Sequence, residues 1–261
     1  MTTAPDVLRR LVSSDPGRPR ITVYDDTDSP TRGERVELSA RVLANWVAKA
    51  ANLLQDDLDV APGSVVRLDL PPHWRTLYWA LAVWSVGACV EVPERRCGEP
   101  AGAGGGTSVD AAGTASAHPA GVLVTDDPVA AAAATEVGVE HVVLVTLAAL
   151  ARSATAVVPS GAVDEARDLA THGDVFDAWE EPEPDDAALR TPAGDTDHES
   201  LVPTGGDAGA RVHTTTTDTA AFLRLALEAW AADGSVVLTR GEAAREVLAR
   251  RLADEGVTRS A

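Results

Sequence analysis

One polar segment in the second half of the chain carries side chains that could ligate a metal ion. Asp195, Asp197, His198 and Glu199 lie close together in it. Carboxylates and imidazoles are common ligands of divalent cations. Loops that bind hard cations show a more definite order of ligands, and no second ligand group follows here at an interpretable spacing. We therefore interpret the segment as a polar loop and predict no metal site.

A second candidate is a group of four glycines, Gly102, Gly104, Gly105 and Gly106. A dinucleotide-binding turn needs its glycines directly between a strand and a helix. Here prolines intervene, and no helical pattern follows closely. We predict instead that residues 94–119, which are rich in Gly, Ala and Ser, form a flexible surface loop.

The sequence shows no local motif for a catalytic nucleophile. It contains no Gly-x-Ser-x-Gly elbow and no Cys or His pattern with zinc spacing. Its two cysteines, Cys89 and Cys97, cannot make a disulfide framework. Cys89 falls in an apolar strand, where it is expected to be a small buried side chain. No catalytic residue is predicted from these features.

The elements that would position any site are clearest between Glu34 and Val92. Residues 35–38 alternate as a strand does, and Ser39 follows as a helix N-cap. Leu43, Val47 and Leu54 then share one helical face. A strand over 65–70, a helix over 73–85 that ends at Gly87, and a strand from 89 follow. This succession predicts a parallel sheet with right-handed crossovers.

Further elements extend the α/β pattern on both sides. Before this stretch we expect a helix over 4–12 and a hairpin of strands 21–24 and 34–38. After the glycine-rich loop the predicted strands are 122–124, 141–147, 200–202 and 235–238, and the predicted helices are 127–134, 147–152, 163–176, 219–232 and 243–253. We predict one α/β domain over residues 1–261, with a mainly parallel sheet flanked by helices.

The charge of the chain limits its partners. The net charge is −18, and residues 161–200 hold 13 acidic residues against Arg167 and Arg190. Nucleic-acid binding needs clustered Lys and Arg, and the same charge opposes docking on anionic membranes. Residues 1–20 lack the apolar run of a signal peptide, and no apolar stretch is long enough to span a membrane. We predict no nucleic-acid or membrane partner, and we expect a cytoplasmic protein.

Several stretches resemble, in order and spacing, the opening of the AMP-binding, adenylate-forming enzymes, which include acyl-CoA synthetases, luciferases and peptide-synthetase adenylation domains. The stretches are Val36–Leu38, Ala51–Leu54, Val60–Val66, Leu70–Pro72, Trp74–Val90, Trp230–Leu238 and Glu255–Thr258. The resemblance covers most of the chain, fits most poorly over residues 94–196, and corresponds to the first half of the family's large N-terminal domain. The chain also resembles short, stand-alone homologues of these enzymes in high-GC bacteria.

This resemblance implies a phosphate-binding loop at residues 204–211, where the family has a loop rich in Ser, Thr and Gly that ends in Lys. Thr204, Gly205 and Gly206 would let backbone N–H groups approach phosphates, and Arg211 would stand for the Lys. Asp207 adds negative charge where the phosphates of ATP would lie. We expect a degenerate loop. Either it keeps some affinity for ATP or AMP through Thr204, Gly205, Gly206 and Arg211, or, as we favour, it no longer binds ATP.

The resemblance also implies what this stretch of chain lacks. In the family, the later half supplies the acidic residue on magnesium, the Asp that holds the ribose, and a C-terminal domain with the catalytic Lys. The only lysine here, Lys49, lies on an early amphipathic helix and cannot match the catalytic one. Because adenylation depends on positioning and charge stabilisation, we expect no complete acyl-activating reaction from this chain alone.

Two functions are therefore expected from the sequence. The first is a non-catalytic or incomplete homologue that acts as a small-ligand (nucleotide or acyl) binding or protein-interaction module. The alternative is an adenylate-forming ligase with residual activity, or one completed by a partner chain. Half of the family's domain would expose sheet edges and apolar surface, so we also expect a homo-oligomer or a protein partner.

Overall fold

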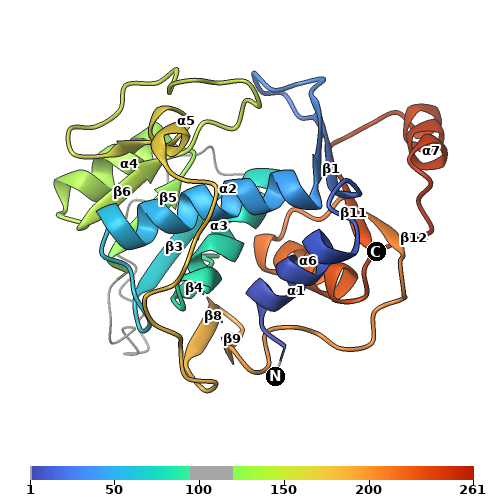
Figure 1. The fold of residues 1–261 in the computed structure, drawn as a ribbon. Coiled ribbons are helices and arrows are strands. Elements are labelled where there is room, and N and C mark those ends of the chain that lie inside the picture. The colour runs from blue at the N-terminus through green and yellow to red at the C-terminus, as the bar shows by residue number, and fades with distance from the viewer. Residues whose placement is uncertain (1, 95–119) are drawn as a thin grey trace.

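The computed structural model describes residues 2–94 and 120–261, and the strands of these residues form two sheets (Figure 1). One sheet has the order β12-β10-β11-β1-β2 and the other has the order β7-β6-β5-β3-β4-β8-β9. The first contains β1 (Pro19–Asp26), β2 (Arg35–Ser39), β10 (Arg211–Thr214), β11 (Ser235–Gly241) and β12 (Arg259–Ser260). The second contains β3 (Val65–Asp69), β4 (Cys89–Glu91), β5 (Val122–Thr125), β6 (His141–Leu144), β7 (Val163–Asp164), β8 (Ala187–Thr191) and β9 (Gly194–Asp197).

Most neighbouring strands in both sheets are parallel, as the sequence predicts. The antiparallel pairs among the described residues are β1–β2 and β8–β9, one at an edge of each sheet. Helices cover the parallel strands, because a parallel connection needs a crossover that packs back onto the sheet. The mainly parallel α/β fold class is thus confirmed.

The sequence analysis predicted that the strands at residues 35–38, 65–70 and from 89 lie in one parallel sheet, and this prediction is wrong. The strand after Glu34 pairs antiparallel with β1, whereas β3 and β4 belong to the other sheet. A tight turn decides this pairing, since Gly33 takes a φ of +88° and its N–H donates to the carbonyl of Asp25. The predicted hairpin is therefore confirmed, and α2 (Ala40–Asn52) carries the chain from one sheet to the other.

A layer of four helices forms the centre of the core. It contains α1 (Ala4–Ser14), α2, α3 (Trp74–Ser85) and α6 (Thr219–Ala231). Every residue of α3 from Trp74 to Trp84 is buried. The reason is that α3 contacts strands of both sheets and the other three helices of the layer. Local signals fixed the helix ends as predicted. Ser39 accepts from the Val42 N–H at 3.3 Å, and Gly87 has a φ of +78°.

The remaining helices are shorter or more peripheral. α4 (Pro128–Glu136) lies on the seven-stranded sheet, and Asp127 caps it as predicted. A short π-helix, η1 (Leu53–Asp57), extends α2, and α5 (Glu165–Asp168) continues into a 3₁₀ turn, η2 (Leu169–Thr171). α7 (Arg245–Asp254) stands at the edge of the molecule, and none of its residues is buried (Figure 1).

Three local predictions are wrong, and hydrogen bonds explain two of them. Residues 147–152 form a turn and not a helix. The Arg75 guanidinium donates to the Ala148 carbonyl, and the Ala149 N–H donates to the Glu34 carboxylate, so these groups are not available for helical hydrogen bonds. Residues 200–202 form no strand, since the Ser200 N–H donates to Asp197 in a turn. Within residues 163–176, helical structure is limited to residues 165–171. Residues 95–119 of the predicted flexible loop, with Cys97 and the four glycines, lie outside the described residues.

Candidate functional site

The predicted phosphate loop lies at the amino ends of the strands of the five-stranded sheet. Residues 204–210 precede β10, and Arg211 is the first residue of that strand, next to Ser235 at the start of β11. In open parallel α/β sheets, ligands bind outside the carboxyl ends of the strands. The loop therefore lies at the edge of the sheet opposite to the usual ligand site.

The two glycines of this loop have different surroundings. Gly205 takes a φ of +100°, and nothing would lie within 4 Å of a Cβ there. At Gly206 a Cβ would lie 2.8 Å from the Glu228 carbonyl oxygen and 3.2 Å from Ala232 Cβ, at the carboxyl end of α6. Helix carboxyl ends carry partial negative charge, which disfavours phosphate. Gly206 is thus explained by close packing against α6.

Arg211 is held by side chains of its own sheet. Its guanidinium donates to Thr22 Oγ1 at 2.9 Å and to Ser235 Oγ at 3.2 Å, and it forms an ion pair with Glu255. Its side chain is 15% exposed. Thr204 is exposed. Of the four predicted residues, Arg211 lines the polar pocket described next.

The pocket has a volume of about 510 Å³ and carries both signs of charge. Its charged lining residues are Arg18, Arg35, Glu37, Arg211, Asp254 and Glu255. Within it, the Arg35 guanidinium donates to Glu255 at 2.7 Å and to the Tyr24 hydroxyl at 2.9 Å. Two arginines and a tyrosine therefore converge on the carboxylate of Glu255, which follows α7 in the chain.

These contacts set the ionisation of the pocket. Burial by itself would raise the pKa of Glu255, but hydrogen bonds from Tyr24, Arg35 and Arg211 hold this pKa below its ordinary value of 4.5. Burial and the hydrogen bond to Glu255 raise the pKa of the Tyr24 hydroxyl. Glu255 is thus ionised at neutral pH. Its carboxylate pairs with the Arg211 guanidinium, the positive charge that a phosphate would need.

A second group of polar side chains lies at the carboxyl ends of the same strands, and the sequence analysis did not identify it. Asp25 accepts from Arg240 at 2.6 Å and from Thr31 at 2.6 Å, and it also accepts from Thr27. Burial would raise the pKa of Asp25, but the hydrogen bonds from the two threonines and the Arg240 charge lower it. The signal in the sequence was an Asp at the end of an apolar strand.

Two buried histidines lie near that carboxyl edge. His213, on β10, is 3.1 Å from Thr239 Oγ1, and His73 caps α3 by accepting from the Arg75 N–H at 3.3 Å. Burial lowers the pKa of both imidazoles, and the charge of Arg240 acts in the same direction on His73. Both side chains are therefore neutral at pH 7.

A third polar cluster is enclosed in the core. Arg75 donates to Glu165 at 2.6 Å and to the Ala148 carbonyl at 2.9 Å, and the Tyr78 hydroxyl donates to the same carboxylate. Arg75 also stacks over Trp74, 4.4 Å from the ring centroid. The sequence did contain a signal for this cluster. Arg75 is the single charged residue of a mostly apolar helix, and a buried charge needs a partner.

The acidic segment considered for metal binding is dispersed. Asp195 pairs with Arg190 at 3.3 Å, Asp197 accepts from the Ser200 N–H at 2.7 Å, and His198 is buried. Over residues 2–94 and 120–261 no group of three His, Cys, Asp or Glu side chains is arranged to hold a metal ion. Within the same residues, none of the helices has the length and apolar character needed to cross a membrane.

Comparison with known proteins places this fold. No model of a known protein family matches the chain. A TIGR03089 family protein from Mycobacterium tuberculosis is 49% identical over 82 residues, which is 31% of this chain and 32% of that protein. An acyl-CoA synthetase from Brucella canis matches 99% of this chain and 46% of its own, with a TM-score of 0.71 and 15% identity.

A second solved structure is the N-terminal subdomain of NpsA from Klebsiella oxytoca in complex with anthranilyl-AMSN. It matches 100% of this chain and 59% of its own, with a TM-score of 0.58 and 17% identity. The chain thus spans about half the length of the solved structures it matches, and the stretch that matches the curated relative covers about a third of that protein. The predicted resemblance is confirmed as a shared fold with the N-terminal region of adenylate-forming enzymes.

Proposed function

Because the chain has the fold of the N-terminal region of acyl-CoA synthetases and adenylation domains, we propose that it is a non-catalytic or incomplete homologue of acyl-adenylating enzymes. In this proposal the chain does not activate carboxylic acids by itself. It acts as a protein-interaction or small-ligand binding module, with a nucleotide such as ATP or AMP, or an acyl group, as the candidate small ligands.

The observation that supports this proposal most strongly is the engagement of Arg211. This side chain would have to supply the positive charge of a phosphate loop, yet it is bound to Glu255, Thr22 and Ser235. To contact a phosphate, Arg211 would have to break its ion pair with Glu255, and this partly buried carboxylate would then lose one of its counter-charges. That loss opposes binding, because breaking a buried charge pair is strongly unfavourable.

The surroundings of Gly206 point in the same direction. Its close approach to the Glu228 carbonyl is explained by packing on α6, and a phosphate at that place would face the carbonyl end of the helix. Transition-state stabilisation in adenylation needs donors that are free and aimed at the phosphates. Of the two kinds of module, the geometry therefore favours protein interaction over nucleotide binding.

Release of pyrophosphate from ATP tests the proposal directly. The purified chain is incubated with ATP, magnesium and a panel of carboxylic acids, and pyrophosphate is measured over time. We expect no release above the background without protein. Sustained turnover that disappears in Arg211→Ala and remains in the surface control Arg32→Ala would overturn the proposal.

A second candidate function is an adenylate-forming ligase with residual activity, or one completed by a partner chain. The observation that favours it is α7, which carries Val247, Leu248 and Leu252 but buries none of them. Such a helix has apolar surface available for another chain. The same assay with a candidate partner separates the two functions, since only the completed ligase would release pyrophosphate when the partner is added.

A further inference from the structure

A segment without helix or strand, residues 172–186, crosses the outer face of α2 on its way to β8 and is called the strap below (Figure 1). Side chains of α2 hold the first residues of the strap. Lys49 donates to the His172 carbonyl at 2.5 Å. Asn52 donates to the Val175 carbonyl at 2.9 Å. The backbone of this part of the strap is therefore fixed by hydrogen bonds.

The later part of the strap is held in the same way. On η1, the Gln55 amide donates to the Asp177 carbonyl at 3.2 Å, and its oxygen accepts from the Trp179 N–H at 3.0 Å. Beside β9, the His198 N–H donates to the Asp186 carbonyl at 3.0 Å. A partner that binds the strap therefore meets an ordered backbone, and this order lowers the entropy cost of association.

The strap presents two large apolar side chains to solvent. Val175 is 77% exposed and Trp179 is 71% exposed, whereas Phe176 packs against the core. The other five tryptophans of the chain are buried or half-buried. Tryptophan is among the residues that contribute most to protein interfaces, and the face of its ring attracts cations. Trp179 thus offers an aromatic surface to a partner.

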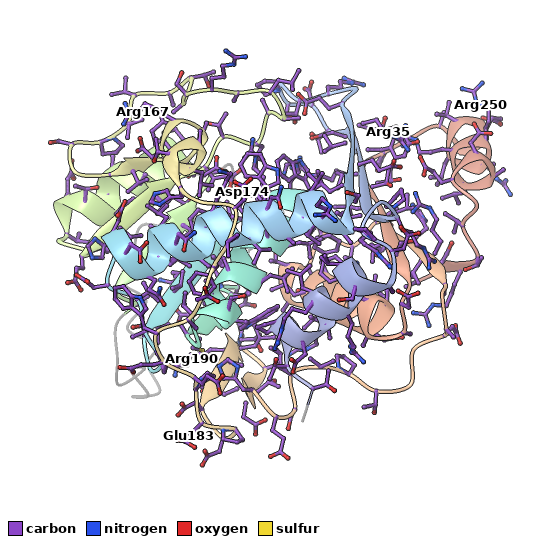
Figure 2. The ribbon with its side chains drawn as sticks, viewed as in Figure 1. Arg35, Arg167, Asp174, Glu183, Arg190 and Arg250 are labelled. Carbon is purple, nitrogen blue, oxygen red and sulfur yellow. The ribbon has the colours of Figure 1, made fainter. Side chains whose placement is uncertain are left out.

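The strap is also strongly acidic. Residues 174–186 hold seven acidic residues and no basic one. In Figure 2, Asp174 lies over α2, and Glu183 lies at the lower end of the molecule. Five of the seven are exposed and form no ion pair within the described residues, namely Asp177, Glu180, Glu181, Glu183 and Asp185.

The basic side chains around the strap do not neutralise these five carboxylates. The Lys and Arg side chains that hold the strap or flank it in the sequence have carboxylate partners of their own. These pairs are Lys49 with Asp174 at 2.8 Å, Arg167 with Asp168 at 2.9 Å, and Arg190 with Asp195 at 3.3 Å. The five carboxylates are thus available to positive charge from another molecule.

The carboxylates are spread along the strap and do not converge on one point. Within residues 2–94 and 120–261 no group of three His, Cys, Asp or Glu side chains is arranged to hold a metal ion. Positive charge that is spread along a chain matches this arrangement better than a single ion does. Arginine fits both features of the strap, because its guanidinium stacks on aromatic rings and pairs with carboxylates.

We propose that the strap binds an arginine-rich segment of another protein, with one guanidinium stacked on Trp179 and others paired with the carboxylates around it. The aliphatic stems of the bound arginines would lie along Val175. The net charge of −18 attracts a basic partner and repels a second copy of this chain. This inference rests on the protein-interaction part of the proposed function and states the chemistry of the partner.

Fluorescence anisotropy with labelled peptides tests the proposal. The probes are an octamer of arginine and an octamer of lysine, which carry equal charge, and binding is measured at about 50 and 150 mM salt. We expect the wild type to bind the arginine octamer at least about threefold more tightly, because an ammonium group does not stack on Trp179 as a guanidinium does. Both affinities should fall as the salt concentration rises, since the contacts are ionic.

Substitutions locate the binding surface. The strap variant, Glu180→Gln with Glu181→Gln, should raise the Kd for the arginine octamer about fivefold. The control variant, Glu136→Gln with Glu140→Gln, changes the net charge by the same amount at exposed positions on and after α4, and should change the Kd less than about twofold. Trp179→Ala should raise the Kd about threefold and remove the preference for arginine over lysine. Circular dichroism melting shows that each variant is folded.

Several results would overturn the inference. They are a wild type that binds neither octamer, a lysine octamer that binds as tightly as the arginine octamer, and a strap variant that loses no more affinity than the control variant. Concentration-dependent self-association of the wild type in sedimentation velocity that is lost in the strap variant would place a second copy on the strap instead. These measurements need no nucleotide, and the pyrophosphate assay needs no peptide, so failure of this inference and failure of the proposed function are distinguished.

Discussion

Two regions of this molecule combine the same three residue types, arginine, tyrosine and glutamate, in different surroundings. In the core, Arg75 and Tyr78 contact Glu165, whose side chain is fully buried. On the five-stranded sheet, beside a polar pocket, Tyr24 joins Arg35 and Arg211 on Glu255, and this group is called the edge cluster below. The residues are alike, so differences between the clusters show what their positions contribute.

The difference is clearest in the two carboxylates. Burial raises the pKa of Glu165 above its ordinary value, and the attraction of Arg75 offsets this only in part. For Glu255 the hydrogen bonds from Tyr24, Arg35 and Arg211 outweigh burial, and the pKa falls below the ordinary value. Desolvation thus dominates in the core, whereas charged donors dominate at the edge.

This comparison suggests different roles for the two clusters. The core cluster joins α3 to α5 and to residue 148, so it fixes the chain that leads into residues 172–179. The edge cluster neutralises the arginine that a phosphate loop would use. A function inferred from residue types alone would treat them as equivalent, and the following changes separate them.

The largest effect is expected from Glu165→Ala. This change leaves the buried Arg75 guanidinium without its carboxylate, which costs about 3–5 kcal/mol in the free energy of unfolding. Urea denaturation measures it. As a control, Arg75→Met combined with Glu165→Leu should recover most of the loss, since an apolar pair needs no counter-charge. A loss below about 1 kcal/mol in the single variant would show that the pair is not buried as described.

Gly206→Ala is expected to have the next largest effect. The added Cβ would lie 2.8 Å from the Glu228 carbonyl oxygen, and overpacking of this kind costs about 1–3 kcal/mol. The thermal midpoint should fall without any ligand present. The matched control is Gly63→Ala, which has open space but a φ of +87°, so it reports backbone strain alone. Unchanged stability with altered nucleotide binding would support a phosphate role for Gly206 instead.

Arg211→Ala should destabilise the chain by about 1–2 kcal/mol, because Thr22, Ser235 and Glu255 each lose a donor. Arg211→Lys should recover part of this loss, since an ammonium keeps the charge but lacks the planar fork that reaches several acceptors. Chemical denaturation of both variants compares them. Equal stability of wild type and Arg211→Ala would mean that this edge cluster contributes nothing to the fold.

The smallest effect is the pH dependence, and the two carboxylates should give opposite signs. The pKa of Glu165 is raised, so its contribution to stability is full below its ordinary value of 4.5 and declines as the pH rises through the raised pKa. The pKa of Glu255 is lowered, so its contribution is full above 4.5 and is lost as the pH falls through the lowered pKa.

Glu165→Gln and Glu255→Gln test these signs by urea denaturation at several pH values. Relative to wild type, Glu165→Gln should be most destabilising below pH 4.5, and Glu255→Gln should be most destabilising at neutral pH. Parallel pH profiles for the two variants would contradict the comparison between core and edge.

The sequence predicted the features that local residues decide. Ser39 and Asp127 cap their helices, and the first hairpin forms around Gly33 as expected. The distribution of the strands over two sheets could not be predicted from the sequence, because it depends on pairings such as β1 with β11, which join distant parts of the chain. At residues 200–202 a local turn replaces the predicted strand, since the Ser200 N–H donates to Asp197.

The candidate site was predictable only in part. The resemblance identified Arg211 as the charged residue of interest, but its partner Glu255 lies 44 positions later in the chain. The pairing of Arg75 with Glu165 spans 90 positions, and the hydrogen bond from Asn52 to the Gly173 carbonyl spans 121 positions. Such contacts leave no periodic signal in a sequence, because only the folded chain brings them together.

The central claim is that Arg211 serves the fold and not a nucleotide. Isothermal titration calorimetry of the wild type with ATP and magnesium tests it most directly, with AMP titrated in parallel. We predict no saturable heat for either ligand. Saturable binding of ATP that is abolished in Arg211→Ala, while that variant remains folded by circular dichroism, would contradict the claim.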